Sequence, residues 1–133
     1  LGTISTMPPE GYKPSYAGAY GGDFDQKDVG VGSRVHLPVI HPGAQVFFAD
    51  PHAVISDGII SGTGIECSAS VRARIGLNKA VKLDRPIIER GPTRDDPRPC
   101  FLRFAERQPQ DRLDQPILVI GIELEVRGRR RGE

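Results

Sequence analysis

Apolar and polar residues alternate most clearly over residues 67–75. One side of this stretch carries apolar side chains, and the other carries serines and arginines; the apolar set is Cys67, Ala69, Val71, Ala73 and Ile75. Because successive side chains of a strand point to opposite faces, the pattern predicts a half-buried strand. The same reasoning predicts a strand at 117–126, where every even-numbered residue from Leu118 to Val126 is apolar.

Shorter apolar stretches predict further strands at 34–40, 45–50, 87–89 and 100–104. The first two flank a turn at His41-Pro42-Gly43, and a turn near Gly76 and Asn78 is expected to end the long strand. Residues 1–32 are dense in Gly, Pro, Tyr and Asp and are expected to form an ordered loop region. The sequence therefore predicts a mostly β protein, a sandwich or barrel-like domain of short antiparallel strands with long Gly/Pro-rich loops.

Composition limits the classes of function. The chain has 133 residues, a net charge of +1 and no tryptophan, so it lacks the field and the aromatic surfaces typical of nucleic-acid binding. No apolar run approaches the roughly 18 residues of a membrane span, and no signal peptide is visible. We expect a cytoplasmic protein without nucleic-acid or membrane partners. Segments 90–99 and 105–116 are expected to be exposed loops, and the basic run 127–131 a solvated end.

Candidate chemistry is concentrated in three short clusters. They are Gly21-Gly22-Asp23-Phe24-Asp25, Asp50-Pro51-His52-Ala53 and Gly62-Thr63-Gly64-Ile65-Glu66. Carboxylates and imidazoles bind divalent metals or move protons, and glycine allows close approach of the backbone. Each residue also has a purely structural interpretation: Asp25 as a turn former, His52 as a satisfied surface or core residue, and Glu66 as an outer-face ion-pair partner.

A hairpin would bring these clusters together. If the predicted strands at 45–50 and 63–75 pair, Glu66 approaches Asp50 and His52, which lie two residues apart and would share one strand face. We expect Asp57 to form a turn before Gly58. His36 alternates with apolar neighbours and is expected to face outward; like His41, it is expected to lie outside the site.

The order of the motifs resembles the acetamidase/formamidase family. The resemblance covers residues 1–89 and rests on the three clusters together with Leu1-Gly2-Thr3-Ile4, Leu37-Pro38-Val39, Pro42-Gly43-Ala44 and Asp57-Gly58. It implies hydrolysis of small aliphatic amides, such as formamide or acetamide, to a carboxylic acid and ammonia on a mostly β fold with a divalent metal. The chain departs from the family pattern at four positions: Asp23 replaces asparagine, Phe24 replaces methionine, and Ala49 and Pro51 replace the two glycines of a Gly-Asp-Gly-His motif.

The resemblance also bears on assembly. Family members are about twice this long, and the chain begins at Leu1 inside a family motif. We expect residues 1–133 to form a single domain, either the C-terminal part of a larger amidase or one subunit of a split one. The expected partner is a second chain that carries the family's N-terminal half, or further copies in a homo-oligomer. A non-catalytic subunit that serves assembly or binding is the alternative.

With the family match, roles can be assigned. Asp25 and His52 are predicted metal ligands, with zinc favoured and manganese, iron or calcium as alternatives. Glu66 is the predicted general base, and Asp50 orients His52 or binds the metal itself. The predicted substrate-binding residues are Gly22, Asp23, Phe24 and Gly64.

Other chemistry remains open. Backbone N–H groups of Gly21 and Gly22, or of residues 62–64, are candidate donors to an oxyanion. Ser61 and Cys67 remain candidate nucleophiles, and a different or cyclic amide remains a possible substrate. Cys67 and Cys100 are too few for a disulfide framework and are expected to be reduced thiols.

Overall fold

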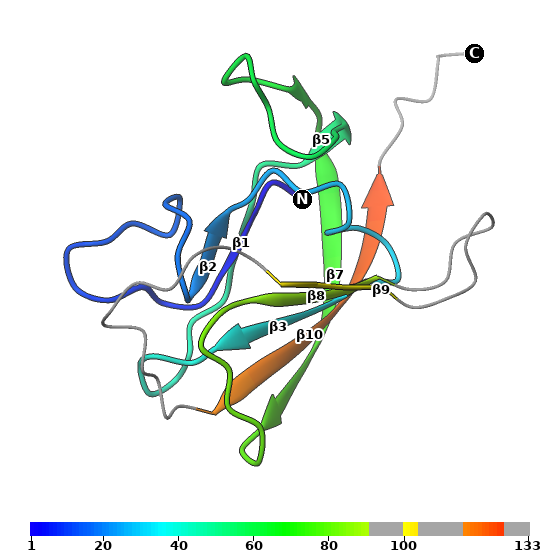
Figure 1. Cartoon of the computed structure of the whole chain (residues 1–133). Coiled ribbons are helices and arrows are strands. Elements are labelled where there is room, and N and C mark those ends of the chain that lie inside the picture. The colour runs from blue at the N-terminus through cyan, green and yellow to red at the C-terminus, as the bar shows by residue number, and fades with distance from the viewer. Residues whose placement is uncertain (91–99, 104–115, 127–133) are drawn as a thin grey trace.

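The computed structural model describes residues 1–90, 100–103 and 116–126, which form ten strands and no helix (Figure 1). Every strand pair is antiparallel. Within the described ranges, no helix is present that could cross a membrane.

The strands form three sheets. A three-stranded sheet in the order β2-β1-β4 contains β1 (Thr3–Ser5), β2 (Gly21–Asp23) and β4 (Phe47–Ala49). A five-stranded sheet in the order β7-β10-β3-β8-β9 contains β3 (Arg34–Pro38), β7 (Ala69–Asn78), β8 (Ile87–Arg90), β9 (Cys100–Arg103) and β10 (Ile117–Val126). A small ribbon pairs β5 (His52–Val54) with β6 (Ile65–Glu66).

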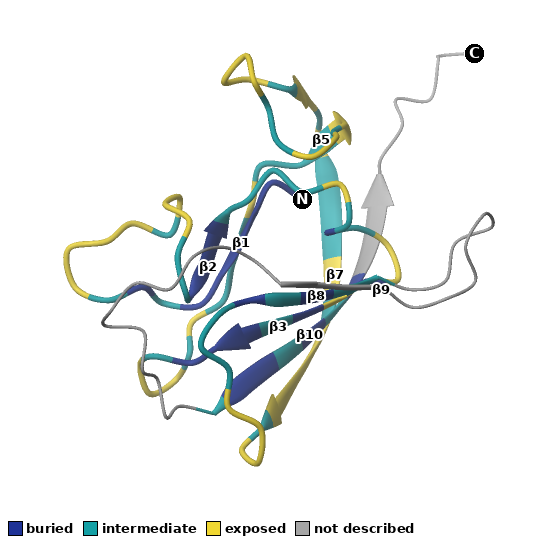
Figure 2. Cartoon of the chain, in the orientation of Figure 1, coloured by how far each residue is buried: buried dark blue, intermediate teal, exposed yellow. Residues whose placement is uncertain are grey.

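The core contains residues of both larger sheets. Ile4 of β1 is fully buried, as are Val35 and Leu37 of β3, which alternate with outward-facing positions. Figure 2 shows the buried residues gathered on β1, β2, β3 and the lower part of β10. The buried apolar cluster comprises Leu1, Ile4, Val29, Val35, Leu37, Val39, Ile88, Leu118, Ile120 and Ile122. Burial of this apolar surface is the main driving force that holds the sheets together.

The predicted fold class is confirmed as antiparallel β, with sheets that do not close into a barrel. All of the strands predicted from the apolar pattern are present, with ends shifted by a few residues. His36 faces away from the core, as its alternation with Val35 and Leu37 predicts.

Two local predictions are wrong in part. Residues 1–32 are not only loop, because β1 and β2 lie within them and pair with each other. Three-residue strands are too short to show a period of two, so the pattern could not reveal them. The expected turn begins at Asn78 and not at Gly76: β7 continues to Asn78, which pairs with Ile117 and whose Oδ1 accepts from the N–H groups of Ala80 and Val81. The ten-residue β10 offers a full ladder of backbone partners, and this overrides the weak strand preference of glycine.

The predicted strand partners are also wrong in part. The strands on either side of the turn at residues 41–43 enter different sheets, because β4 pairs with β1 rather than with β3. Residues 45–50 do not pair with 63–75; the adjacent β5 and β6 pair instead. Apart from Arg90 and Pro116, the predicted loops at 90–99 and 105–116 lie outside the described residues, as do the basic run 127–131 and the side chain of Cys100.

Candidate metal centre

His52 is the residue around which the candidate site is arranged. Its side chain is only 1% exposed, and neither ring nitrogen has a hydrogen-bond partner. Nε2 lies 3.8 Å from Asp50 Oδ2 and 3.7 Å from Glu66 Oε1. These separations are too long for hydrogen bonds. They are close to the roughly 3.3 Å between two tetrahedral ligands that share one zinc ion.

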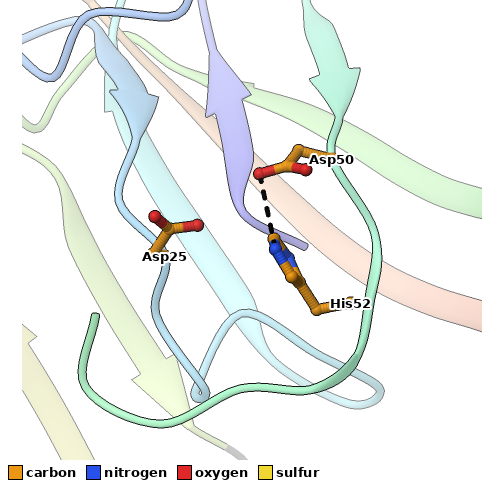
Figure 3. A group of neighbouring side chains, drawn as sticks. All are labelled: Asp25, Asp50 and His52. Atoms are coloured by element: carbon orange, nitrogen blue, oxygen red, sulfur yellow. Dashed lines mark ion pairs between the residues drawn. The ribbon is translucent and has the colours of Figure 1, made fainter. Parts of the chain in front are cut away.

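Asp25 and Asp50 complete a group with His52. One ligand atom from each of the three residues lies within 4.8 Å of the others, and Figure 3 shows the Asp50 carboxylate above the imidazole and Asp25 to its left. Oδ1 of Asp25 is buried without a hydrogen-bond partner. Buried polar atoms normally have partners, so these orphaned oxygen and nitrogen atoms fit the ligands of a cation. Two carboxylates and an imidazole are also a ligand set that divalent metals accept.

The backbone at both aspartates is unusual. Asp25 has φ 48° and Asp50 has φ 58°, in the left-handed region that few residues other than glycine adopt. Such conformations persist where surrounding contacts impose them, and they are concentrated at functional sites. The Asp50 conformation also explains how Asp50 and His52 approach each other without sharing a strand: the chain turns between β4 and β5 instead of continuing straight. The expected common strand face is therefore wrong, although the expected proximity is confirmed.

Gly2 fixes the two aspartates relative to each other. Its N–H donates to the Asp50 carbonyl at 2.7 Å, and its own carbonyl accepts from the N–H groups of Phe24 and Asp25. A Cβ atom at Gly2 would overlap Asp50 Oδ2 and crowd Asp25 Oδ1. A residue with a side chain would therefore displace both carboxylates. In the sequence, the only signal for Gly2 is its membership of the Leu1–Ile4 motif.

Glu66 reaches the site through the β5–β6 ribbon. The strand register places it opposite His52, and Cys67 N–H donates to the Pro51 carbonyl at 3.0 Å just beyond that pair. The Glu66 side chain is 58% exposed, in contrast to that of His52. The carboxylate therefore faces both His52 and solvent, as a group that exchanges protons with water requires. The alternative for Glu66 is an outer-face ion pair with Arg72 or Arg74. The structure instead places its carboxylate beside His52.

Two carboxyl groups of the site have raised pKa values. Burial raises the pKa of Asp25 most, and the nearby carboxylates of Asp23 and Asp50 raise it further, while His52 opposes them. For Glu66, a side-chain hydrogen bond with Asp50 is the main cause of the raised pKa, followed by desolvation and the Asp50 charge. Without a cation, three carboxylates therefore crowd one imidazole. A bound cation would relieve this repulsion.

The predicted substrate-binding residues do not all meet at this site. Gly64 lies against the His52 ring, where an added Cβ would overlap Cδ2 and Nε2. Phe24 packs against the core, and Asp23 accepts a hydrogen bond from Thr3 Oγ1 at 2.9 Å. Gly22 lies within β2 against the backbone of Tyr16 and Ala17, which leaves no room for a ligand at its Cα.

Other candidates are occupied by local contacts. The N–H groups of Gly21 and Gly62 donate to the carbonyls of Gly18 and Ile59, respectively. Neither N–H is therefore available to an oxyanion. The remaining candidates contact nearby backbone or side chains: Ser61 Oγ with Thr63 O, Cys67 Sγ with Pro51 O, His36 with Glu89, His41 with Pro8 O, and Asp57 with Lys27. Cys67 is a free thiol near the site, as expected.

Comparison with known proteins adds one positive finding. The model of the Acetamidase/Formamidase family matches residues 6–131. The match extends well past residue 89, where the resemblance visible in the motifs ends. Neither curated proteins nor solved structures gave a match.

Proposed function

Because the chain belongs to the acetamidase/formamidase family, we propose that it hydrolyses the carbon–nitrogen bond of small aliphatic amides. Water is the second reactant, and the products are a carboxylic acid and ammonia. Family membership suggests amide hydrolysis in general; the choice of formamide- or acetamide-like substrates is our proposal. The single observation that carries the proposal is the buried His52 imidazole, unpartnered at both nitrogens and flanked by three carboxylates.

Asp25, Asp50 and His52 are the residues that would hold a divalent ion. Zinc accepts this mixture of oxygen and nitrogen ligands, and manganese, iron and calcium are the alternatives. When bound, such an ion supplies a Lewis acid that polarises a carbonyl and makes water more acidic. His52 enters from a buried position, so its ring orientation is fixed by packing against Gly64.

Glu66 is proposed to move the proton. In the neutral-pH reaction its carboxylate accepts a proton from the attacking water as the new carbon–oxygen bond forms. The same proton then passes to the amide nitrogen as the carbon–nitrogen bond breaks, so that ammonia leaves neutral. Glu66 suits this role because its carboxylate lies 3.7 Å from His52 Nε2 and faces solvent as well. Its position at the solvent-facing side of His52 lets it exchange that proton with bulk water.

An assembly is proposed as the active form, as further copies of this chain or with a second chain that carries the family's N-terminal half. Ile75 and Leu77 of β7 are 51% and 55% exposed, although they share the sheet face that is buried at Ile120. Among the described strands, β7 stands at the edge of its sheet. Exposed apolar side chains on an unpaired edge are typical of strands that another chain covers.

Ammonia release from acetamide and formamide tests the proposed function. We expect release by the wild-type protein in its assembled form, as a homo-oligomer or together with the second chain, and a loss of at least about a hundredfold in Glu66→Gln, which keeps the shape but not the proton acceptor. A non-catalytic subunit would give no release from either amide, with zinc supplied and with the oligomeric state determined by light scattering on the same sample. That result would contradict the amidase proposal.

A further inference from the structure

A second feature lies on the five-stranded sheet, apart from the candidate metal centre. A hollow of about 450 Å³ is lined by residues of β3, β7 and β10, including Arg34, Arg74, Gly76 and Gly121. The strand register aligns Arg34, Gly121 and Arg74 across three neighbouring strands. Side chains at aligned positions share a face of the sheet, so the two arginines flank a residue that has no side chain.

The hollow exists because two strand positions are glycine. A Cβ at Gly121 would have Arg74 O as its nearest neighbour at 3.8 Å, and one at Gly76 would have Val119 O at 3.9 Å. Both are ordinary van der Waals separations, and neither glycine has the positive φ that would require it. Backbone geometry and packing therefore do not demand glycine here. Glycine within a strand often marks a place where a ligand or another backbone approaches closely.

The charge of the hollow is positive. Arg34 is 63% exposed and donates to Glu89 Oε1 at 3.2 Å, and His36 shares the same carboxylate. Arg74, by contrast, makes no hydrogen bond or ion pair within the described part of the chain. The register places Gly121, which has no side chain, beside Arg74. Glu89 therefore offsets the charge of Arg34, whereas no described residue pairs with Arg74.

We propose that this hollow binds a small oxyanion, a carboxylate or phosphate group, between Arg34 and Arg74. Two intervening strand spacings separate the arginine backbones by roughly 10 Å. Side chains of arginine length can reach inward from both sides toward one oxyanion or toward the two ends of a short dianion. The planar guanidinium donates two parallel hydrogen bonds to carboxylate or phosphate oxygens, which gives geometric selection as well as charge attraction.

The proposal is independent of amide hydrolysis. None of the residues that line the hollow belongs to the Asp25, Asp50 and His52 group. A metal ion at that group would itself attract phosphate, so the binding experiment requires protein treated with a chelator. Loss of anion binding would then say nothing about the metal centre. Loss of metal binding would likewise say nothing about the anion site.

Isothermal titration of the chelator-treated 133-residue protein tests the proposal, with inorganic phosphate and succinate as separate probes at fixed ionic strength. We expect saturable binding of at least one probe, which identifies the preferred oxyanion. Arg74→Gln should weaken it at least about tenfold, because it removes a charge-assisted contact. Gly121→Val, a good strand former, should fill the hollow and abolish binding while circular dichroism reports a folded protein.

Arg72→Gln is the matched control. It removes the same charge from the same strand, but Arg72 does not line the hollow. Its affinity should stay within about twofold of wild type, because fixed ionic strength screens a charge that makes no direct contact. The proposal is overturned if neither probe binds saturably, or if Arg72→Gln weakens binding as much as Arg74→Gln.

Discussion

Asp25 and Asp50 both hold a left-handed backbone conformation, with φ 48° and 58°, and one residue joins them. The N–H of Gly2 donates to the backbone carbonyl of Asp50, and the carbonyl of Gly2 accepts from the backbone N–H of Asp25. Two strained positions tied to one glycine hold their carboxylates beside a buried imidazole. Strain of this kind costs on the order of 1–3 kcal/mol per residue, so a compensating interaction such as ion binding is expected.

His52→Ala should remove the metal and the activity together. The imidazole is the only nitrogen ligand in the group, and its loss leaves two carboxylates without it. We expect metal affinity to fall at least about a hundredfold, more than the loss typical of an outer-shell partner. Equilibrium dialysis with zinc measures the affinity, and ammonia release measures the activity.

His41→Ala serves as its control. Nε2 of His41 contacts the Pro8 carbonyl at 3.0 Å, and His41 does not belong to the metal-binding group. This variant should bind zinc as the wild type does. Equal loss in both variants would mean that any removed histidine perturbs zinc binding, and His52 would no longer be identified as a ligand.

Asp25→Asn should separate metal binding from folding. Burial disfavours the Asp25 carboxylate, whereas asparagine is neutral, similar in shape and tolerant of the left-handed conformation. The metal-free variant should therefore melt at or above the temperature of metal-free wild type. With zinc at about a hundred times its Kd, wild type should gain about 2.7 kcal/mol of stability and the variant little or none.

The pH dependence of the metal-free proteins gives a further check on Asp25. Its folded-state pKa lies above the unfolded value, so the folded protein holds the proton more tightly. The contribution of Asp25 to stability should therefore rise as pH falls from neutral toward its ordinary pKa of 3.8, and Asp25→Asn should lack that contribution. A wild-type slope that is unchanged in the variant would contradict the raised pKa.

Glu66→Gln should lower turnover while zinc binding stays near wild type. A general base contributes roughly 10²–10⁴-fold to rate, and glutamine cannot accept the proton. Wild-type activity should fall on the acidic side of its pH profile, because a protonated Glu66 cannot accept the proton. Loss of zinc in this variant would instead make Glu66 a ligand, and unchanged turnover would remove it from the mechanism.

Gly64→Ala should turn the His52 ring. The added methyl would overlap Cδ2 and Nε2, and Gly64 lacks the positive φ that would add backbone strain. We expect zinc affinity to fall about 10- to 100-fold, the range for a lost orienting contact, while the protein stays folded. Gly30→Ala is the control, because its Cβ would meet only Lys27 O at 3.9 Å. Wild-type affinity in Gly64→Ala would show that Gly64 does not position the imidazole.

The sequence predicts the long strands and the residue types of the site, but not how they meet. Alternation identified 67–75 and 117–126 because a half-buried strand repeats every two residues. It could not identify β1, whose three residues are buried on both faces. It also could not predict that β4 pairs with β1 and that β5 pairs with β6, since strand partners depend on contacts distant in sequence.

The residues of the site also divide into those that the sequence predicts and those that it does not. Asp25, Asp50, His52 and Glu66 were predictable because carboxylates and imidazole beside glycine and proline match known ligand and proton-transfer chemistry. Gly2 was not, because its role depends on backbone hydrogen bonds to two aspartates that are distant in sequence. Gly22 is assigned to the substrate from its motif, yet it packs against the backbone of Tyr16 and Ala17. Neighbours of a functional residue in sequence need not be neighbours in the site.

Zinc content is the most direct test of the central claim that Asp25, Asp50 and His52 form a metal centre. Wild type and His52→Ala would both be stripped with a chelator, dialysed against zinc and then against metal-free buffer, and measured by elemental analysis. The account predicts about one zinc ion per wild-type chain and essentially none in the folded variant. No zinc in the wild type, or equal zinc in both proteins, would contradict it.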